Sequence, residues 1–422
     1  NLKIICLSAT IENQSLTTLN TLFSPNEPIK ILSAARLRPE QEIWIAPEAK
    51  NSVEREKRVL EALRHLPRPA ILYVTKIDDA TSWNTKIKSE GFKNFEMIHG
   101  NSSNHHREVV VEKWKTGNLD LVIGTSAFGL GINYQHARTV IHACIPEDIN
   151  RYYQEIGRTG RDNKASVAML IPEHKDLQVA SGIAEKIIIS VKYGLPRWQE
   201  MFHNKKESPD GNNHYLVDTS LPPPYRHELY SKLNNTWNQR VLNLMMLSGM
   251  IEIKGTEFKK DEQGENGKNY TKIFVKSGGH SNKTKWDTKV EPTRQKILNS
   301  SREGLDLMKK MISQKKCHSK LLKEYYTLQH EGLEYGVIEA CGSCKTCRDR
   351  NDRDKTWFSK KPIFPREVWK IGGVNESFKK YFSNDEGYHI EWNEDIFGGR
   401  NLRHLKETFK IFWENGVHKS II

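Results

Sequence analysis

Between residues 70 and 171, short apolar runs alternate with amphipathic stretches that are long enough to form helices. The runs are AILYV from residue 70, LVI from residue 121, TVIHA from residue 139 and SVAMLI from residue 166, and a further run ends at Ile98. Strands that are apolar along their whole length are buried on both faces, which is typical of a parallel sheet covered by helices. The pattern therefore predicts a doubly wound α/β domain.

Folds of this kind place their functional residues in the loops that follow the carboxyl ends of the strands. After Ala143 comes the string YYQEIGRTGRD, residues 152–162, in which Arg158 and Arg161 are flanked by glycines. Because guanidinium groups bind phosphate oxygens in a forked geometry, two of them at this spacing are suited to a nucleotide in its transition state. The alternative is a solvated helix end with ordinary surface arginines.

The loop after Ile123 opens into hydroxyl groups and glycines within the string LVIGTSAFGLGIN, residues 121–133. Its hydroxyls and exposed backbone N–H groups can bind a nucleic-acid phosphate without contacting a base, although a tight turn is the simpler explanation of a lone G-x-G. His99, which follows Ile98, is a further candidate, and a capped loop histidine is the alternative there.

These strings resemble the signature motifs of superfamily 2 helicases, and together they resemble the RecQ family. Residues 121–133 look like motif V and residues 152–162 like motif VI. Residues 70–74 with His99-Gly100 look like motif IV and the segment after it, and Ser8-Ala9-Thr10, after an expected strand over 4–7, is similar to motif III. The resemblance covers residues 1 to about 180.

The resemblance implies an ATP-dependent DNA helicase that unwinds in the 3′ to 5′ direction and uses Mg²⁺ with ATP. The implied catalytic residues are Gln154, Arg158 and Arg161. The implied nucleotide contacts are Gly157, Gly160 and Asn133. The implied nucleic-acid contacts are Thr125, Ser126, Phe128, Gly129, Gly131 and His99.

One departure from the family is that the sequence has no G-x-x-x-x-G-K-[ST] phosphate loop and no D-E-x-H string after an apolar strand. ATP lies between two RecA-like domains, with the phosphate loop on the first. We therefore expect this chain to be inactive alone and to work with an N-terminal RecA-like ATPase domain. The start at Asn1, within an apolar stretch, favours a missing part of the same chain over a separate polypeptide. The rival hypothesis is a non-catalytic DNA-binding subunit with a structural zinc module.

The string CGSCKTC, residues 341–347, carries three thiols at metal-binding spacing, and Cys317 lies upstream of it. The spacing predicts a closed structural Zn²⁺ site whose ligands are Cys317, Cys341, Cys344 and Cys347. An iron–sulfur cluster is the alternative, as is replacement of Cys317 by His318 or His330. The resemblance extends here, since the RecQ family has a helical hairpin that ends in a four-cysteine zinc module.

Beyond residue 190 the pattern changes to a helix over 237–247, ended by Gly249, and two strand-like segments at 250–253 and 270–275. Helix followed by hairpin is the order of a winged helix, and a small α+β linker domain is the alternative. The expected organisation is the end of a first RecA-like domain over 1–33, a second RecA-like domain over 34–190, a winged-helix-like region over 191–300, a zinc-binding module over 301–350, and a C-terminal region of unassigned role over 351–422.

The formal net charge is +13, from 65 Lys and Arg against 52 Asp and Glu, which indicates a polyanionic partner. Several lysines precede the cysteine string, and we expect Lys315 and Lys316 to contact the DNA backbone, although a charge run is often only a solvated face. No apolar run approaches the length of a membrane span. Six cysteines, three of them in one string, indicate a reducing compartment, hence a cytoplasmic or chromosome-associated location.

Overall fold

The computed structural model describes residues 5–8, 10–23, 27–125, 136–186, 188–225, 232–260, 267–341 and 343–350. Several predictions fall outside these residues. They concern the C-terminal region over 351–422 and the motif V residues Ser126, Phe128, Gly129, Gly131 and Asn133.

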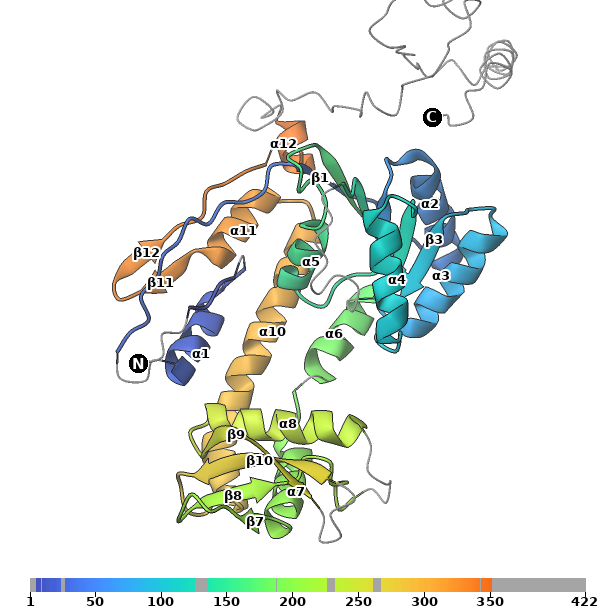
Figure 1. Cartoon of the computed structure of the whole chain (residues 1–422). Helices are drawn as coiled ribbons and strands as arrows, with labels where there is room; N and C mark the ends of the chain where they lie inside the picture. The colour runs from blue at the N-terminus through green and yellow to red at the C-terminus, as the bar shows by residue number, and fades with distance from the viewer. Residues whose placement is uncertain are drawn as a thin grey trace, which may run out of the picture.

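A six-stranded sheet, parallel throughout, forms the largest domain, with the strand order β1-β6-β5-β2-β4-β3 (Figure 1). Its strands are β1 (Gln41–Ile45), β2 (Ala70–Tyr73), β3 (Phe95–Ile98), β4 (Leu121–Gly124), β5 (Thr139–His142) and β6 (Ser166–Leu170). Every residue of β2, β4 and β5 is buried, as the continuous apolar runs predict. The predicted doubly wound α/β fold is confirmed.

Helices cover both faces of this sheet, and successive residues of one strand enter different cores. Leu72 packs with residues of α2 (Ser52–His65) and α3 (Ile77–Ser89), such as Leu63 and Ile87. Its neighbours Ile71 and Tyr73 point into the opposite core, which α4 (Asn104–Lys115) and α5 (Ile149–Ile156) help to form. This alternation follows from the period of two residues in a strand.

Two parts of the sheet domain differ from the sequence-based expectation. The expected strand over 4–7 is wrong for residues 5–7, which have no regular structure, with Ile5 and Leu7 82% and 91% exposed. A strand needs a neighbour to accept its backbone hydrogen bonds, and these residues pair with no strand among the described residues. Conversely, β1 carried no clear signal, because its residues QEIWI alternate in burial at the edge of the sheet.

A smaller α+β region follows. It consists of α7 (Val191–His203), β7 (Lys206–Glu207), β8 (His214–Val217), α8 (Lys232–Leu247), β9 (Ile251–Lys260) and β10 (Gly267–Val275). Its strands form an antiparallel sheet in the order β7-β8-β10-β9. The predicted helix and hairpin are present as α8 and β9–β10, and Gly249 follows α8 with φ +73°. The predicted order of helix and hairpin is thus present, and the winged-helix assignment stays a prediction.

Two helices connect this region to the sheet domain (Figure 1). The chain leaves the sheet domain through α6 (Asp176–Lys186) and returns to it through α10 (Glu291–Ile312). A short α9 (Lys283–Lys285) and a π-helical turn (Trp286–Val290) lead into α10. Val290 lies in the core of the α+β region, whereas Leu305 and Met308 lie in the core of the sheet domain. The expected domain boundary between residues 300 and 301 therefore falls inside one continuous helix.

The cysteine-bearing segment lies against the β1 edge of the sheet. It comprises α11 (His318–Tyr326), β11 (Leu328–His330), β12 (Leu333–Tyr335) and α12 (Lys345–Asp349), and we call residues 317–350 the cysteine module. Asn13 of α1 (Asn13–Phe23) contacts it, since its Nδ2 donates to the Thr327 carbonyl at 3.1 Å. Among the described residues, no helix has the length and apolar character needed to cross a membrane.

Candidate active site

The residues predicted to act on a nucleotide lie on α5 and in the turn after it, residues 157–164, which we call the arginine turn. Asp148 caps the start of α5, because its side chain accepts a hydrogen bond from the Asn150 amide at 2.9 Å. Gly157 ends the helix, and its N–H donates to the Tyr153 carbonyl at 2.9 Å. The helix follows β5 and runs back along the sheet, so the turn lies beside the amino ends of β1, β5 and β6: the Gly160 N–H donates to the Ala137 carbonyl, and Asp162 accepts from Arg138. The expectation of a site at the carboxyl edge is therefore wrong for this turn.

Three arginines converge at this turn. Arg161 donates from Nε to the Gly157 carbonyl at 3.3 Å, and Arg38, from the segment before β1, donates to the same carbonyl at 2.9 Å. Burial lowers the pKa of Arg161, and the positive charges of Arg158 and Arg38 lower it further. Positive groups gathered this closely create a site that an anion would stabilise.

Gln154 joins the two strings that resemble motifs III and VI. Its Nε2 donates to the Thr10 Oγ1 at 2.9 Å, and the Thr10 backbone N–H donates to the Ser8 Oγ at 3.1 Å. These residues are 144 positions apart in the sequence, so the contact depends on the fold. The middle residue of the motif III string, Ala9, lies outside the described residues.

A buried polar network joins α5 to the strand β5, and the sequence analysis did not predict it. Glu155 accepts from His142 at 2.8 Å and from Arg151 at 2.9 Å, and the side chains of His142 and Glu155 are 0% and 4% exposed. Burial raises the pKa of Glu155, but the hydrogen bond from His142 and the charge of Arg151 outweigh it, so the net shift is downward. The only sequence signal was an acid within the motif VI string.

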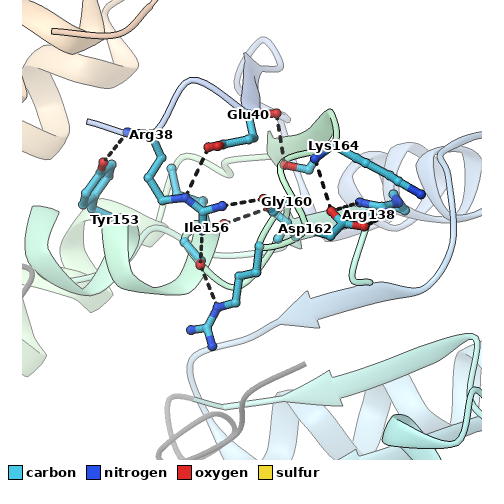
Figure 2. Close-up of polar contacts among 12 residues, drawn as sticks. Arg38, Glu40, Arg138, Tyr153, Ile156, Gly160, Asp162 and Lys164 are labelled. Atoms are coloured by element: carbon cyan, nitrogen blue, oxygen red, sulfur yellow. Dashed lines mark hydrogen bonds and ion pairs between the residues drawn. The ribbon is translucent and has the colours of Figure 1, made fainter. Parts of the chain in front are cut away.

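Gly160 and Asp162 fix the far side of the arginine turn. Gly160 has φ +63°, and a Cβ atom there would lie 2.7 Å from the Glu40 Cβ, so any side chain would clash. Asp162 accepts from both Nη atoms of Arg138, at 2.9 Å for Nη1 and Oδ1, and Figure 2 shows this pair beside the turn. Burial raises the pKa of Asp162, and the hydrogen bonds and charge of Arg138 lower it by more.

Thr125 and His99 lie at the ends of neighbouring strands, β4 and β3. Thr125 is buried, and its N–H donates to the Ile98 carbonyl at 3.2 Å. The His99 Nδ1 accepts from the Asn101 N–H at 3.2 Å, while Arg107 donates to the carbonyls of His99 and Gly100. These contacts favour the capped-loop interpretation of His99, and its role at nucleic acid stays a prediction.

The four predicted metal ligands meet in one cluster, in which the Sγ atoms of Cys317, Cys341, Cys344 and Cys347 all lie within 4.8 Å of one another. A tetrahedral Zn²⁺ with bonds of about 2.3 Å would place its sulfur ligands about 3.8 Å apart, so the spacing fits. Neither His318 nor His330 belongs to this cluster, and their Nε2 atoms contact the carbonyls of Met311 and Ile29. The donor set is therefore the four thiols.

Direct contacts attach the cysteine module to β1. The Ser343 Oγ accepts from the Ile43 N–H at 3.3 Å and donates to the Gln41 carbonyl at 3.2 Å. The Arg348 guanidinium lies 3.7 Å from the centre of the Trp44 ring. Polar partners on the cysteine module thus cover a sheet edge that would otherwise be open.

Three of the six lysines between residues 309 and 323 form ion pairs. Lys316 contacts both carboxylate oxygens of Glu324, at 2.6 and 2.7 Å, and Lys323 contacts Glu339 at 3.0 Å. Lys309 contacts Asp306 at 2.8 Å. These pairs reduce the charge that the segment offers to a phosphate backbone, and the DNA contacts of Lys315 and Lys316 stay predictions.

The fold and the comparisons define the class of this domain. Residues 54–163, from α2 to the arginine turn, match the family model of the helicase conserved C-terminal domain. Among solved structures, S. cerevisiae Dbp5 bound to RNA and ADP BeF3 has a TM-score of 0.35 and 20% identity, covering 42% of this chain and 47% of that chain.

Curated relatives of the chain include ATP-dependent DNA helicases. A probable ATP-dependent DNA helicase RecS of Bacillus subtilis is 27% identical over 182 residues, which are 43% of this chain and 36% of the relative. The ATP-dependent DNA helicase RecQ of the same species is 39% identical over 88 residues, or 21% of this chain and 15% of the relative. The matched part of the chain thus covers at most 36% of the length of these relatives. With the matched domain, they confirm the resemblance of this part of the chain to the C-terminal portion of RecQ-family superfamily 2 helicases.

Proposed function

We propose that this chain is the C-terminal part of an ATP-dependent DNA helicase that translocates 3′ to 5′ and unwinds duplex DNA. In this proposal, Gln154, Arg158 and Arg161 face ATP that is bound against a separate first RecA-like domain. The observation that carries the proposal is the convergence of Arg38, Arg158 and Arg161 at one turn, where burial and then the charges of Arg158 and Arg38 lower the pKa of Arg161. Such a site is stabilised by phosphate.

The proposed role of the arginines follows from the chemistry of phosphoryl transfer. Negative charge accumulates on the transferred γ-phosphoryl group in the transition state, and a positioned guanidinium stabilises it. Gly157 and Gly160 let the turn pack closely against the protein, because a Cβ would lie 3.0 Å from the Tyr153 carbonyl oxygen at Gly157 and 2.7 Å from the Glu40 Cβ at Gly160. Mg²⁺ would neutralise charge between the phosphates and would be held by the first domain, together with its phosphate loop.

Coupling to DNA would pass through the neighbouring strand ends. The Gln154–Thr10 contact links motif VI to the motif III string, and β4, which precedes Thr125 and motif V, lies two strands from β5 in the sheet. Closure of the cleft on ATP and its opening after hydrolysis would then alternate the grip of the two domains on one strand.

For the cysteine module we propose a structural Zn²⁺ held by the four thiolates. Closed four-cysteine sites with no open ligand position are typical of structural zinc, which fixes loop-rich segments. The contacts of Ser343 and Arg348 with β1 would then keep the module against the sheet domain. Metal analysis distinguishes zinc from iron, and iron with sulfide would overturn the assignment.

The decisive experiment is DNA-stimulated ATP hydrolysis by the full-length gene product, wild type beside Arg161→Ala. We expect turnover to fall about a thousandfold or more with DNA binding retained, because the arginine acts on the transition state. Arg64→Ala is the matched control, since Arg64 pairs with Glu90 at the surface, and we expect it to stay within about twofold.

Two further results would change the assignment. Absence of ATP hydrolysis by the full-length wild type with any DNA would favour the rival hypothesis, a non-catalytic DNA-binding subunit. Unwinding of duplexes with a 5′ single-stranded tail, but not of those with a 3′ tail, would reverse the proposed polarity.

A further inference from the structure

Arg38 uses every nitrogen of its guanidinium group near the arginine turn. Nη1 donates to the Gly157 carbonyl at 2.9 Å, Nη2 donates to the Gly160 carbonyl at 2.5 Å, and Nε contacts a Glu40 carboxylate oxygen at 3.2 Å. Figure 2 shows this fork reaching the turn between Glu40 and Tyr153. One side chain thus ties together the end of α5 and the middle of the turn.

The backbone around Arg38 is itself held at several points. The Arg38 N–H donates to the Tyr153 hydroxyl of α5 at 3.1 Å. The Leu37 N–H donates to the Ile338 carbonyl at 2.9 Å, and the Ile338 N–H donates to the Ala35 carbonyl at 3.0 Å. Ile338 belongs to the cysteine module, so Arg38 stands between that module and the arginine turn.

The turn and the Arg38 segment also pack in direct contact. The site of a Cβ on Gly160 lies 2.7 Å from the Glu40 Cβ, and the Ser166 N–H, just after the turn, donates to the Glu40 carbonyl at 2.8 Å. Glu40 is mostly buried and orients Arg38 from the other side. Little space remains for the turn to shift while these contacts persist.

We propose that Arg38 is a positioning residue that holds the arginine turn in place and links it to the cysteine module. Arg38 acts through backbone carbonyls rather than on a ligand. The inference rests on the proposed function only for the role of the turn itself. Arginine suits the task because its planar fork reaches two acceptors at once, whereas a lysine ammonium on a flexible stem cannot reproduce that geometry.

Hydrogen exchange of this chain tests the proposal without any enzymatic activity. The reporters are the N–H groups of Thr159, Gly160 and Asn163, which donate to the carbonyls of Ile156, Ala137 and Gly160. In Arg38→Ala we expect their exchange to rise about tenfold or more, because the turn opens locally. In Arg38→Lys we expect a smaller rise.

Arg36→Ala is the matched control, because Arg36 is exposed and lies two residues from Arg38. We expect its exchange at the turn to equal that of the wild type. The amides of β9 and β10 serve as an internal reference and should be unchanged in every variant. Should Arg38→Ala fail to fold, Arg38→Lys decides the question.

A kinetic readout on the full-length protein separates positioning from general stability. We expect Arg38→Lys, which keeps the charge, to lower kcat about tenfold with little change in the KM for ATP, since a displaced Arg161 affects mainly the transition state. Unchanged exchange at the turn in both Arg38 variants would overturn the inference. Raised exchange in a protein whose wild type hydrolyses no ATP would support the hold on the turn and overturn the proposed function instead.

Discussion

Two basic regions of this molecule use their charges in opposite ways. In the β9–β10 hairpin the lysines lie beside carboxylates: Lys272 contacts Asp210 at 2.8 Å and Glu257 at 3.4 Å, and Lys254 and Lys276 both contact Glu252. At the arginine turn, burial and then the charges of Arg158 and Arg38 lower the pKa of Arg161, and one carboxylate, that of Glu40, contacts Arg38 at 3.2 Å. The net charge of +13 does not distinguish these regions, whereas the arrangement of partners does.

The comparison teaches where a polyanion would gain most. A phosphate at the hairpin would have to compete with carboxylates already in contact with the lysines, and surface pairs of that kind contribute little to stability. A phosphate at the arginine turn would relieve repulsion that the fold itself imposes. The contacts of Arg38 with the Gly157 and Gly160 carbonyls hold the backbone of the turn from which Arg158 and Arg161 project.

The largest effect should come from removing a cysteine ligand, because it should loosen the segment next to the arginine turn much more than the β9–β10 hairpin. We expect Cys344→Ser to release the metal and to raise hydrogen exchange at the Leu37 and Ile338 amides about a hundredfold, because structural metal binding contributes on the order of 10 kcal/mol to such modules. The β9–β10 amides should change less than about twofold. The exposed Cys6 provides a control in Cys6→Ser, and equal loosening of both regions would contradict the expected separation.

The buried network under α5 should come next. We expect Glu155→Gln to lower the free energy of unfolding by about 3 kcal/mol at pH 7, since it breaks a buried charged hydrogen-bond network. The folded-state pKa of Glu155 is lowered, so its contribution is fully present above the unfolded value of about 4.3 and is lost as the pH falls further. Urea denaturation at pH 7 and pH 4 measures this, and an equal effect of Glu252→Gln would break the comparison.

A matched pair of glycines gives a smaller contrast. Gly160 and Gly249 have φ values of +63° and +73°, but only the Gly160 Cβ position lies against a neighbour, the Glu40 side chain. We expect Gly249→Ala to cost about 1 kcal/mol, for the backbone conformation alone, and Gly160→Ala to cost about 2 kcal/mol or more. Equal costs in thermal or urea unfolding would mean that Glu40 moves aside freely.

The smallest effect should be electrostatic and should lie in the hairpin. Hydrogen bonds from Lys254 and Lys276 lower the pKa of Glu252 to about 2. Its contribution is present above the unfolded pKa of about 4.3 and is lost between there and about pH 2, and because the pair is exposed it should stay within about 0.5 kcal/mol. The difference between wild type and Glu252→Gln should vanish in 1 M salt, and its persistence there would mean that the pair is not screened.

Much of the sheet domain could be predicted because its signal is local. The runs at 70–74, 121–123 and 139–143 are apolar throughout, and burial on both faces requires that. The cysteine cluster could be predicted for the same reason, since three of its four thiols lie within seven residues. The motif strings placed the candidate site on α5 and its turn.

What could not be predicted depends on distant partners. Arg38 is one arginine in a loop, and nothing near it in the sequence refers to Gly157, which lies 119 residues away. The His142–Glu155 pair joins a strand to the next helix and is visible only once both are folded. The lysines before the cysteine string looked like a free basic surface until Glu324 and Glu339 were placed beside them.

The continuity of α10 also has a mechanical consequence. Its 22 residues measure about 33 Å at 1.5 Å per residue, with Leu305 and Met308 packed in the core beside α5 and its first turn entering the α+β region. Gly304 brings the helix so close to Asp148, at the start of α5, that an added Cβ would lie 2.5 Å from the carboxylate. Gly304 lies about 20 Å from the first residue of the helix, so a tilt of about 5° about that contact would move the start of α10 by roughly 2 Å. A shift at the start of the arginine-bearing helix would thus displace the α+β region, which α10 contacts through α8.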